Sequence, residues 1–116
     1  MLKAKRSLPT YNDGWLAVYR PKQVRSRFGD EPATVKDLDL VCYAAFSEQS
    51  CREQDYEFAE RESYNLSLKV KVRRRPDIDA GCKAAARGKL FDIKHVDPSG
   101  REMYLYMQEV GDFAAR

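Results

Sequence analysis

The sequence predicts a mainly β protein, a small antiparallel β-barrel or sandwich of about six strands with one short helix in a long loop. Two observations favour this class. Segments in which apolar and polar residues alternate recur along the chain, and a period of two is typical of half-buried strands. Gly and Pro residues then separate these segments at the spacing of barrel and sandwich turns. At 116 residues, the chain has the length of one domain.

We expect three parts along the chain. Residues 1–13 are polar and basic and predict a flexible arm. Residues 14–111 hold every predicted strand and form a single β-barrel-like domain, and residues 112–116 are expected to be a frayed tail. The longest apolar run, Leu40–Phe46, is too short to cross a bilayer, and the N-terminus lacks the apolar segment of a signal peptide. We therefore expect a soluble protein that is made in the cytoplasm and has no membrane partner.

The first two strands are expected on either side of a long basic loop. Trp15–Arg20 follows Gly14 and ends at Pro21, which has no N–H for a strand ladder. The loop spans about residues 21–35, and the second strand runs from about Val35 to Phe46. Alternation places one set of residues of the second strand on a common face: Leu38, Leu40, Cys42, Ala44 and Phe46.

A short helix is predicted after the second strand. Ser50 and Glu53 form the Ser-x-x-Glu pattern of a capping box, which predicts a helix from Cys51 to about Glu60. Glu53 and Asp55 then lie in the first turn, where the helix dipole favours acidic side chains. Because the apolar content of this segment is thin, the helix must dock on the sheet or on a neighbour.

The clearest strand pattern covers residues 66–73. Its apolar and polar positions alternate strictly: Leu66, Leu68, Val70 and Val72 alternate with Ser67, Lys69, Lys71 and Arg73. This pattern predicts a half-buried strand with one basic, solvated face. Pro76 ends the strand, and Pro76–Gly81 is expected to be a connector rich in turns.

Three further strands complete the prediction. A short strand at Cys82–Ala86 is followed by a turn at Arg87–Gly88 and a strand at Leu90–Val96. Asp97–Gly100 predicts a type I turn, with Pro at its second position and Gly at its fourth. In the last strand, Glu102–Val110, methionines and tyrosines are expected on opposite faces.

No motif in the sequence points to catalysis. The single histidine, His95, lies in a predicted strand, where a structural role is expected. Asp77-x-Asp79-x-Gly81 resembles the start of a calcium loop, but its glycine comes one place early and Gly88 replaces the bidentate glutamate, so we expect a polar turn. The cysteines have no paired spacing and are expected to be reduced thiols: Cys42, Cys51 and Cys82. We expect neither an enzyme nor a metal or cofactor.

Charge is distributed in blocks, although the net charge is only +3. The first third of the chain is basic, residues 37–62 are strongly acidic, and residues 69–75 form a second basic stripe. Such blocks suit head-to-tail self-association, and they also suit ion pairs within one copy. A β-barrel nucleic-acid-binding module is an alternative that rests on one set of residues: Lys69, Lys71, Arg73, Tyr104 and Tyr106.

The order of these pieces carries a family resemblance. A strand with basic residues and Pro at its end precedes a Gly-Lys-x-Phe-Asp-Ile piece at Gly88–Ile93 and a Val-Asp-Pro-x-Gly turn at Val96–Gly100. Over about Gly14–Gly111, and best over Leu66–Val110, the chain resembles the head-closure, or head–tail joining, proteins of tailed phages and prophages. The resemblance implies a ring between the portal and adaptor proteins and the tail. This ring closes the DNA-filled head and docks the tail, and its subunits are monomeric when free.

The resemblance and the charge blocks together suggest two sets of partner-binding residues. We expect the acidic segment to lie at the ring lumen or a subunit interface, where DNA passes without specific binding; its site residues are Glu53, Asp55, Glu57 and Glu60. The long basic loop is expected to order on a partner through Arg25, Arg27 and Phe28. The protein would then reside in the host cytoplasm during assembly and in the virion afterwards. Another tail-assembly protein, such as a completion or terminator protein, is a second alternative.

Overall fold

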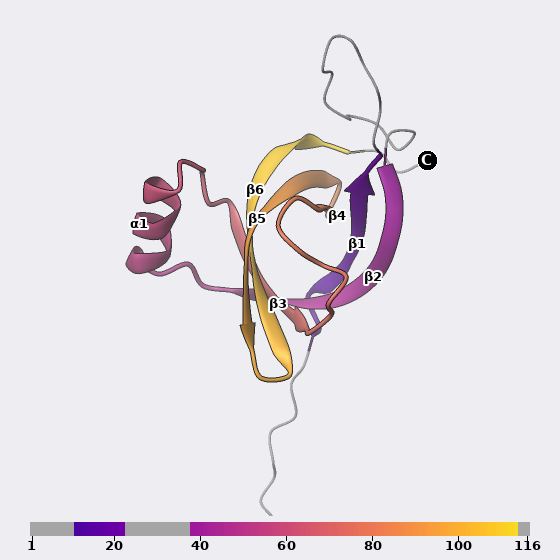
Figure 1. The fold of residues 1–116 in the computed structure, drawn as a ribbon, viewed down its shortest axis with the longest axis horizontal. Helices are drawn as coiled ribbons and strands as arrows, with labels where there is room; N and C mark the ends of the chain where they lie inside the picture. The colour runs from indigo at the N-terminus through magenta and orange to yellow at the C-terminus, as the bar shows by residue number, and fades with distance from the viewer. Residues whose placement is uncertain (1–10, 23–37, 114–116) are drawn as a thin grey trace, which may run out of the picture.

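The computed structural model describes residues 11–22 and 38–113, and these residues form one closed antiparallel β-barrel (Figure 1). The elements are β1 Gly14–Pro21, β2 Leu38–Gln49, α1 Glu53–Arg61, β3 Leu68–Arg73, β4 Lys83–Ala86, β5 Lys89–Ser99 and β6 Glu102–Asp112. Around the barrel the strand order is β1-β2-β3-β6-β5-β4, and pairing of β4 with β1 closes the ring. The predicted mainly β class with six strands and one helix is confirmed, and of the two architectures left open the barrel is the one observed.

Side chains that point inward from the strands fill the barrel. Val70 and Val72 are fully buried, as the alternation in this segment predicted, and Met103 and Met107 of β6 are also buried. The largest fully buried side chains come from four different strands: Phe46, Leu16, Ile93, Leu105 and Met107. The core is therefore a single cluster to which neighbouring strands contribute alternate residues.

A bulge in the pairing of β1 with β2 overturns one predicted core position. Val18 lies opposite Cys42, whereas Tyr19 lies opposite Leu40, so Val41 is the extra residue of the bulge. The bulge moves Leu40 to the outer face, where 48% of its surface is exposed. The prediction that Leu40 shares a buried face with Cys42 was therefore wrong.

Of the two predicted turns in the C-terminal half, the one between β4 and β5 lies where the sequence predicted it, and the one between β5 and β6 does not. The predicted turn at Arg87–Gly88 is confirmed, and both residues have positive φ angles, 54° and 75°. The predicted turn at Asp97–Gly100 was wrong, because Asp97 and Pro98 pair with β6 as part of β5. The turn is instead the two residues Gly100–Arg101, and Gly100 has a φ of 63°.

The last strand extends past its predicted end at Val110. β6 continues to Asp112, and the N–H of Phe113 donates to the carbonyl oxygen of Gly88 at 2.9 Å. The ring of Phe113 also lies 5.8 Å from the ring of Tyr19. These contacts join the end of the described chain to the β4–β5 turn and to β1.

The connection between β3 and β4 crosses one end of the barrel. These two strands lie on opposite sides of the ring of strands, so residues 74–82 must pass over the barrel end. Ile78, in the middle of this connection, is only 2% exposed and packs into the core cluster. The connection therefore closes that end with an apolar side chain.

Candidate binding surfaces

Helix α1 begins with a cap that differs from the predicted one. Arg52 is the N-cap residue, and its backbone N–H donates to Oδ2 of Asp55 at 2.8 Å. The predicted capping box of Ser50 and Glu53 was therefore wrong, because the helix starts later and the Asp55 carboxylate takes the reciprocal role.

Asp55 faces the barrel and forms a buried ion pair. Nζ of Lys69 donates to Oδ2 of Asp55 at 3.0 Å, and both residues are 6% exposed. The Lys69 ammonium also lies 5.5 Å and 5.3 Å from the ring centres of Tyr104 and Tyr106. Burial by itself would raise the pKa of Asp55, but the hydrogen bonds from the Arg52 N–H and Lys69 outweigh it and hold this pKa below its usual range. The pair anchors the first turn of α1 to β3.

Apolar and aromatic contacts complete the docking of α1. Ala59 is 2% exposed and clusters with Tyr64 and Tyr106. The ring of His95 lies 4.7 Å from the ring of Phe58 and 5.3 Å from that of Tyr106. His95 therefore sits in an aromatic stack between α1 and the barrel, in agreement with its expected structural role.

The docked helix covers the strand face that we expected to be basic and solvated. Lys69 is buried beneath α1, and Lys71 is partly buried in an ion pair with Glu102 at 3.6 Å. Of the three basic residues on this face, only Arg73 is exposed. Tyr106 is 7% exposed, so its ring is not available for stacking with a base. The predicted solvated face was therefore wrong for Lys69, and the nucleic-acid platform is covered at Lys69 and Tyr106.

Helical periodicity divides the acidic residues that we expected to act together. Asp55 points inward, whereas the other three lie on the outer face of α1 together with Tyr56, which is 52% exposed. Within the described parts of the chain, these three carboxylates form no ion pair. We call this surface the acidic helix face, and its members are Glu53, Tyr56, Glu57 and Glu60.

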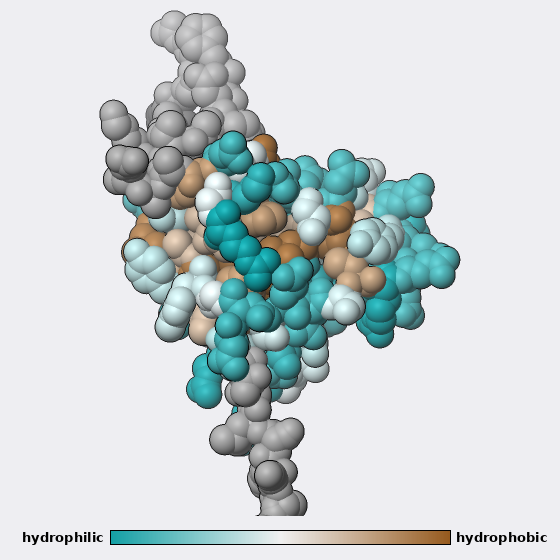
Figure 2. Space-filling model, turned by 180° about the vertical axis from the view of Figure 1, so that it is seen from behind, coloured by the Kyte–Doolittle hydropathy of each residue, from teal (hydrophilic) through white to brown (hydrophobic). Residues whose placement is uncertain are grey.

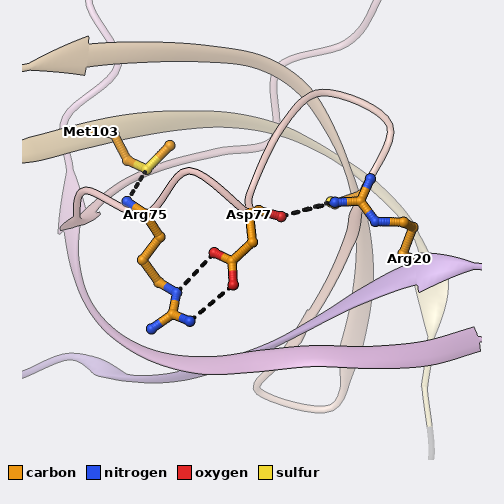
Figure 3. Close-up of polar contacts among 5 residues, drawn as sticks. Arg20, Arg75, Asp77 and Met103 are labelled. Carbon is orange, nitrogen blue, oxygen red and sulfur yellow. Dashed lines mark hydrogen bonds and ion pairs between the residues drawn. The ribbon is translucent and has the colours of Figure 1, made fainter.

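A network of arginines and aspartates fixes the connection between β3 and β4 (Figure 3). The Arg75 guanidinium donates to both carboxylate oxygens of Asp77 at 3.0 Å and 2.9 Å, and its hydrogen bonds lower the pKa of Asp77. The N–H of Arg75 donates to the Met103 sulfur at 3.3 Å. Arg20 donates to the Asp77 carbonyl oxygen and to the Asp79 carboxylate. The segment that resembled a calcium loop is thus a connector in which arginines hold the aspartates.

Two hollows border this network and share Arg73 and Arg75. The first, which we call the arginine cleft, has a volume of about 770 Å³ and is lined by Arg73, Arg74, Arg75, Pro76, Ile78, Val96, Pro98, Arg101 and Met103. The second, the arginine–aromatic groove, has a volume of about 350 Å³ and is lined by Tyr11, Trp15, Tyr43, Ala44, Ala45, Arg73 and Arg75. Among the described residues, Arg73, Arg74 and Arg101 form no ion pair, so their charge is free to meet an anionic partner.

The two exposed aromatic residues of the groove had no role in the sequence prediction. Trp15 is 66% exposed and Tyr43 is 60% exposed. Trp15 lies opposite Ala45 and Tyr43 lies opposite Ala17, so the two rings are neighbours on the outer face of β1 and β2. The alternation of Leu16, which is buried, with Trp15 and Ala17 could have indicated that Trp15 points outward. The position of Tyr43 beside Trp15 depends on the register of β1 with β2, which no local pattern indicates.

The remaining predicted contact residues, Arg25, Arg27 and Phe28, lie outside the described residues. In the described ranges, no group of three or more His, Cys, Asp or Glu side chains is placed to hold a metal ion. The same ranges contain no helix with the length and apolar character needed to span a membrane. A scan of protein-family models finds no match for this chain, and a search of curated proteins finds none either.

Proposed function

We propose that this chain is a structural subunit of the head–tail connector of a tailed phage or prophage. In this role it forms a ring that closes the DNA-filled head and docks the tail, and it acts by binding and not by catalysis. One observation carries the proposal: among the described residues, carboxylates on one side of the molecule and arginines elsewhere on its surface form no ion pair. The resemblance to head-closure proteins supplies the particle in which such a subunit would assemble.

The positions of these charges support side-by-side assembly. α1 and the pair β1–β2 lie on opposite sides of the barrel (Figure 1). Seen from behind, strongly hydrophilic side chains dominate the side that carries α1, and apolar or weakly polar surface is more continuous toward the other side (Figure 2). A ring needs a heterologous contact, in which one patch of a subunit meets a different patch of the next. Two unlike surfaces on different sides of one subunit meet that requirement.

The partners proposed for this ring are portal or adaptor proteins above it and tail proteins below it. Packaged DNA passes nearby, and the outward carboxylates Glu53, Glu57 and Glu60 would repel its phosphates or contact a neighbouring subunit. Asp55 is buried, so we do not propose it for this role. The proposed contacts of Arg25, Arg27 and Phe28 with a partner are retained as a separate hypothesis.

The proposal is tested with heads of the encoding phage that are assembled without this chain. Purified protein is added, and retention of packaged DNA and attachment of tails are measured. We expect the wild-type protein to restore both, and the triple variant Glu53→Gln, Glu57→Gln, Glu60→Gln to restore them poorly. Glu62→Gln is the matched control, because it removes an exposed carboxylate at the helix end but lies off the outer face. Heads that leak DNA equally with and without the wild-type protein would contradict the proposed function.

A nucleic-acid-binding module remains a second candidate because of the arginine cleft and the exposed rings of Trp15 and Tyr43. Arginines beside exposed aromatic rings can hold phosphates while bases stack on the rings. This candidate predicts tight binding to a free oligonucleotide, with an affinity that falls steeply as salt rises. The same measurement should give only weak binding if the chain is a connector subunit.

A further inference from the structure

We propose that the acidic helix face of one copy docks into the arginine–aromatic groove of a second copy. The inference rests on the proposed function and names the contact through which the ring would assemble. Tyr56 would enter the groove, and the glutamates of the same helix face would pair with arginines at the groove and the adjoining cleft.

The groove has the composition of a binding surface for an aromatic side chain. Trp15 and Tyr43 expose 66% and 60% of their surfaces on a strand face whose other positions there are alanines. Tyr11 forms a third aromatic part of the lining, and its hydroxyl is fixed by a 2.8 Å hydrogen bond to Glu102. Aromatic residues and arginine are the residue types that dominate the binding energy of protein interfaces. A groove of about 350 Å³ accommodates the single ring of a tyrosine.

The acidic helix face presents such a ring on a rigid support. Tyr56 is 52% exposed and lies among three glutamates on the outer side of α1. On its inner face, the helix is held to the barrel by the buried pair of Asp55 and Lys69 and by Ala59. Because the helix is already ordered, docking its outer face costs little conformational entropy.

Charge selects the acidic helix as the occupant of the groove. Arg73 and Arg74 make no ion pair among the described residues, whereas Arg75 is already paired with Asp77. The N-terminal arm of the chain is basic, with Lys3, Lys5 and Arg6, so its charge opposes its own entry into the groove. The carboxylates of the acidic helix face have the opposite sign and no ion-pair partner within the described ranges.

The two surfaces must come from different copies. α1 lies on the opposite side of the barrel from β1 and β2, which carry the groove, so one copy cannot satisfy both halves of the contact (Figure 1). Each added subunit therefore leaves one free surface of each kind, and the assembly continues until it closes as a ring or extends as a filament.

The test uses a charge swap between the two surfaces. The helix variant carries Glu57→Arg and Glu60→Arg, and the arginine variant carries Arg73→Glu in the groove and Arg74→Glu in the adjoining cleft. Association of each protein is measured by analytical ultracentrifugation and native mass spectrometry, with circular dichroism to verify folding. We expect each variant alone to associate about 100-fold more weakly than the wild type. In an equimolar mixture the reversed helix of one variant meets the reversed arginine positions of the other, and the wild-type helix of the second variant meets the wild-type arginines of the first. Both contacts join opposite charges, so the mixture should assemble with the two variants alternating, and a chain with all four substitutions should assemble by itself.

Controls separate this contact from a general effect of charge. Glu62→Arg at the C-cap of α1 and Lys94→Glu on the outer face of β5 change exposed charges outside both surfaces and should leave association unchanged. Trp15→Ala should weaken association about 30-fold without a change of charge. Wild-type rings that persist in both charge-reversed variants would overturn this contact and leave the connector role intact. A wild-type chain that stays monomeric at every concentration and on heads would overturn both.

Discussion

Neutralising Asp55 is the sharpest test of how the helix is held to the barrel. Asp55→Asn keeps the shape of the side chain but removes the charge that faces Lys69. The Lys69 ammonium would then remain buried, at 6% exposure, without a counter-ion. The substitution also weakens the acceptor for the Arg52 N–H at the start of α1.

The structure sets the size of the expected effect. Removing one partner of a buried ion pair costs about 3–5 kcal/mol, because it leaves the other charge uncompensated. The pair lies under a helix of nine residues at the edge of the fold, so undocking of α1 limits the loss, and we expect about 3 kcal/mol. Lys69→Met should cost a similar amount when made alone. The double variant should lose about 4 kcal/mol, less than the additive loss of about 6 kcal/mol, which corresponds to a coupling energy of about 2 kcal/mol.

Urea unfolding followed by circular dichroism measures all four proteins of this cycle. Asp77→Asn is the matched control, because the carboxylate of Asp77 pairs with Arg75 where both side chains are more than 40% exposed. Its effect should be clearly smaller than that of Asp55→Asn. Additive effects of Asp55→Asn and Lys69→Met would refute the argument, since they would mean that the two groups do not stabilise one another.

Four further measurements address separate features. The folded pKa of Asp55 lies below the unfolded value of about 3.9, so its contribution is complete above that value and is lost as pH falls through the folded pKa; acid should therefore destabilise the wild type more than Asp55→Asn in urea unfolding. Tyr64→Phe should raise stability by about 1 kcal/mol, because the buried hydroxyl has no hydrogen-bond partner among the described residues; a lower Tm would contradict this. Gly88→Ala should cost about 1 kcal/mol in urea unfolding, since φ is +75° there although space for a Cβ is open. Ile78→Ala should cost about 2–5 kcal/mol if its side chain seals the barrel end, and an unchanged Tm would argue against that role.

Local pattern was sufficient for most of the fold. The strict alternation before Pro76 located β3, and the Arg87–Gly88 pair located a two-residue hairpin turn. Both signals depend on neighbouring residues alone, and the barrel contains the strand and the turn at the predicted positions. Leu40 was assigned to the wrong face because a bulge depends on the partner strand, which the sequence of β2 does not encode by itself.

The binding surfaces were harder to predict because they depend on contacts between distant residues. The alternation correctly placed Lys69 on the outer face of β3, and for that reason we expected it to be solvated. Asp55, fourteen positions earlier, pairs with Lys69 and holds the helix over it. The spacing of Asp55 to Glu57 and Glu60 on a helix could have separated the inward carboxylate from the outward ones. Trp15 and Tyr43 meet only through the register of β1 with β2, which no local pattern specified.

The crossing of residues 74–82 over the barrel end has a consequence for any passage through an assembly of this protein. A barrel of six strands is too narrow to hold more than its own side chains, and the side chain of Ile78 closes one end of it. Each subunit is thus a solid block and not a tube. In the proposed ring, a conduit wide enough for a duplex would be bounded by the outer surfaces of several copies, so the residues that meet its contents would be those that point away from the core.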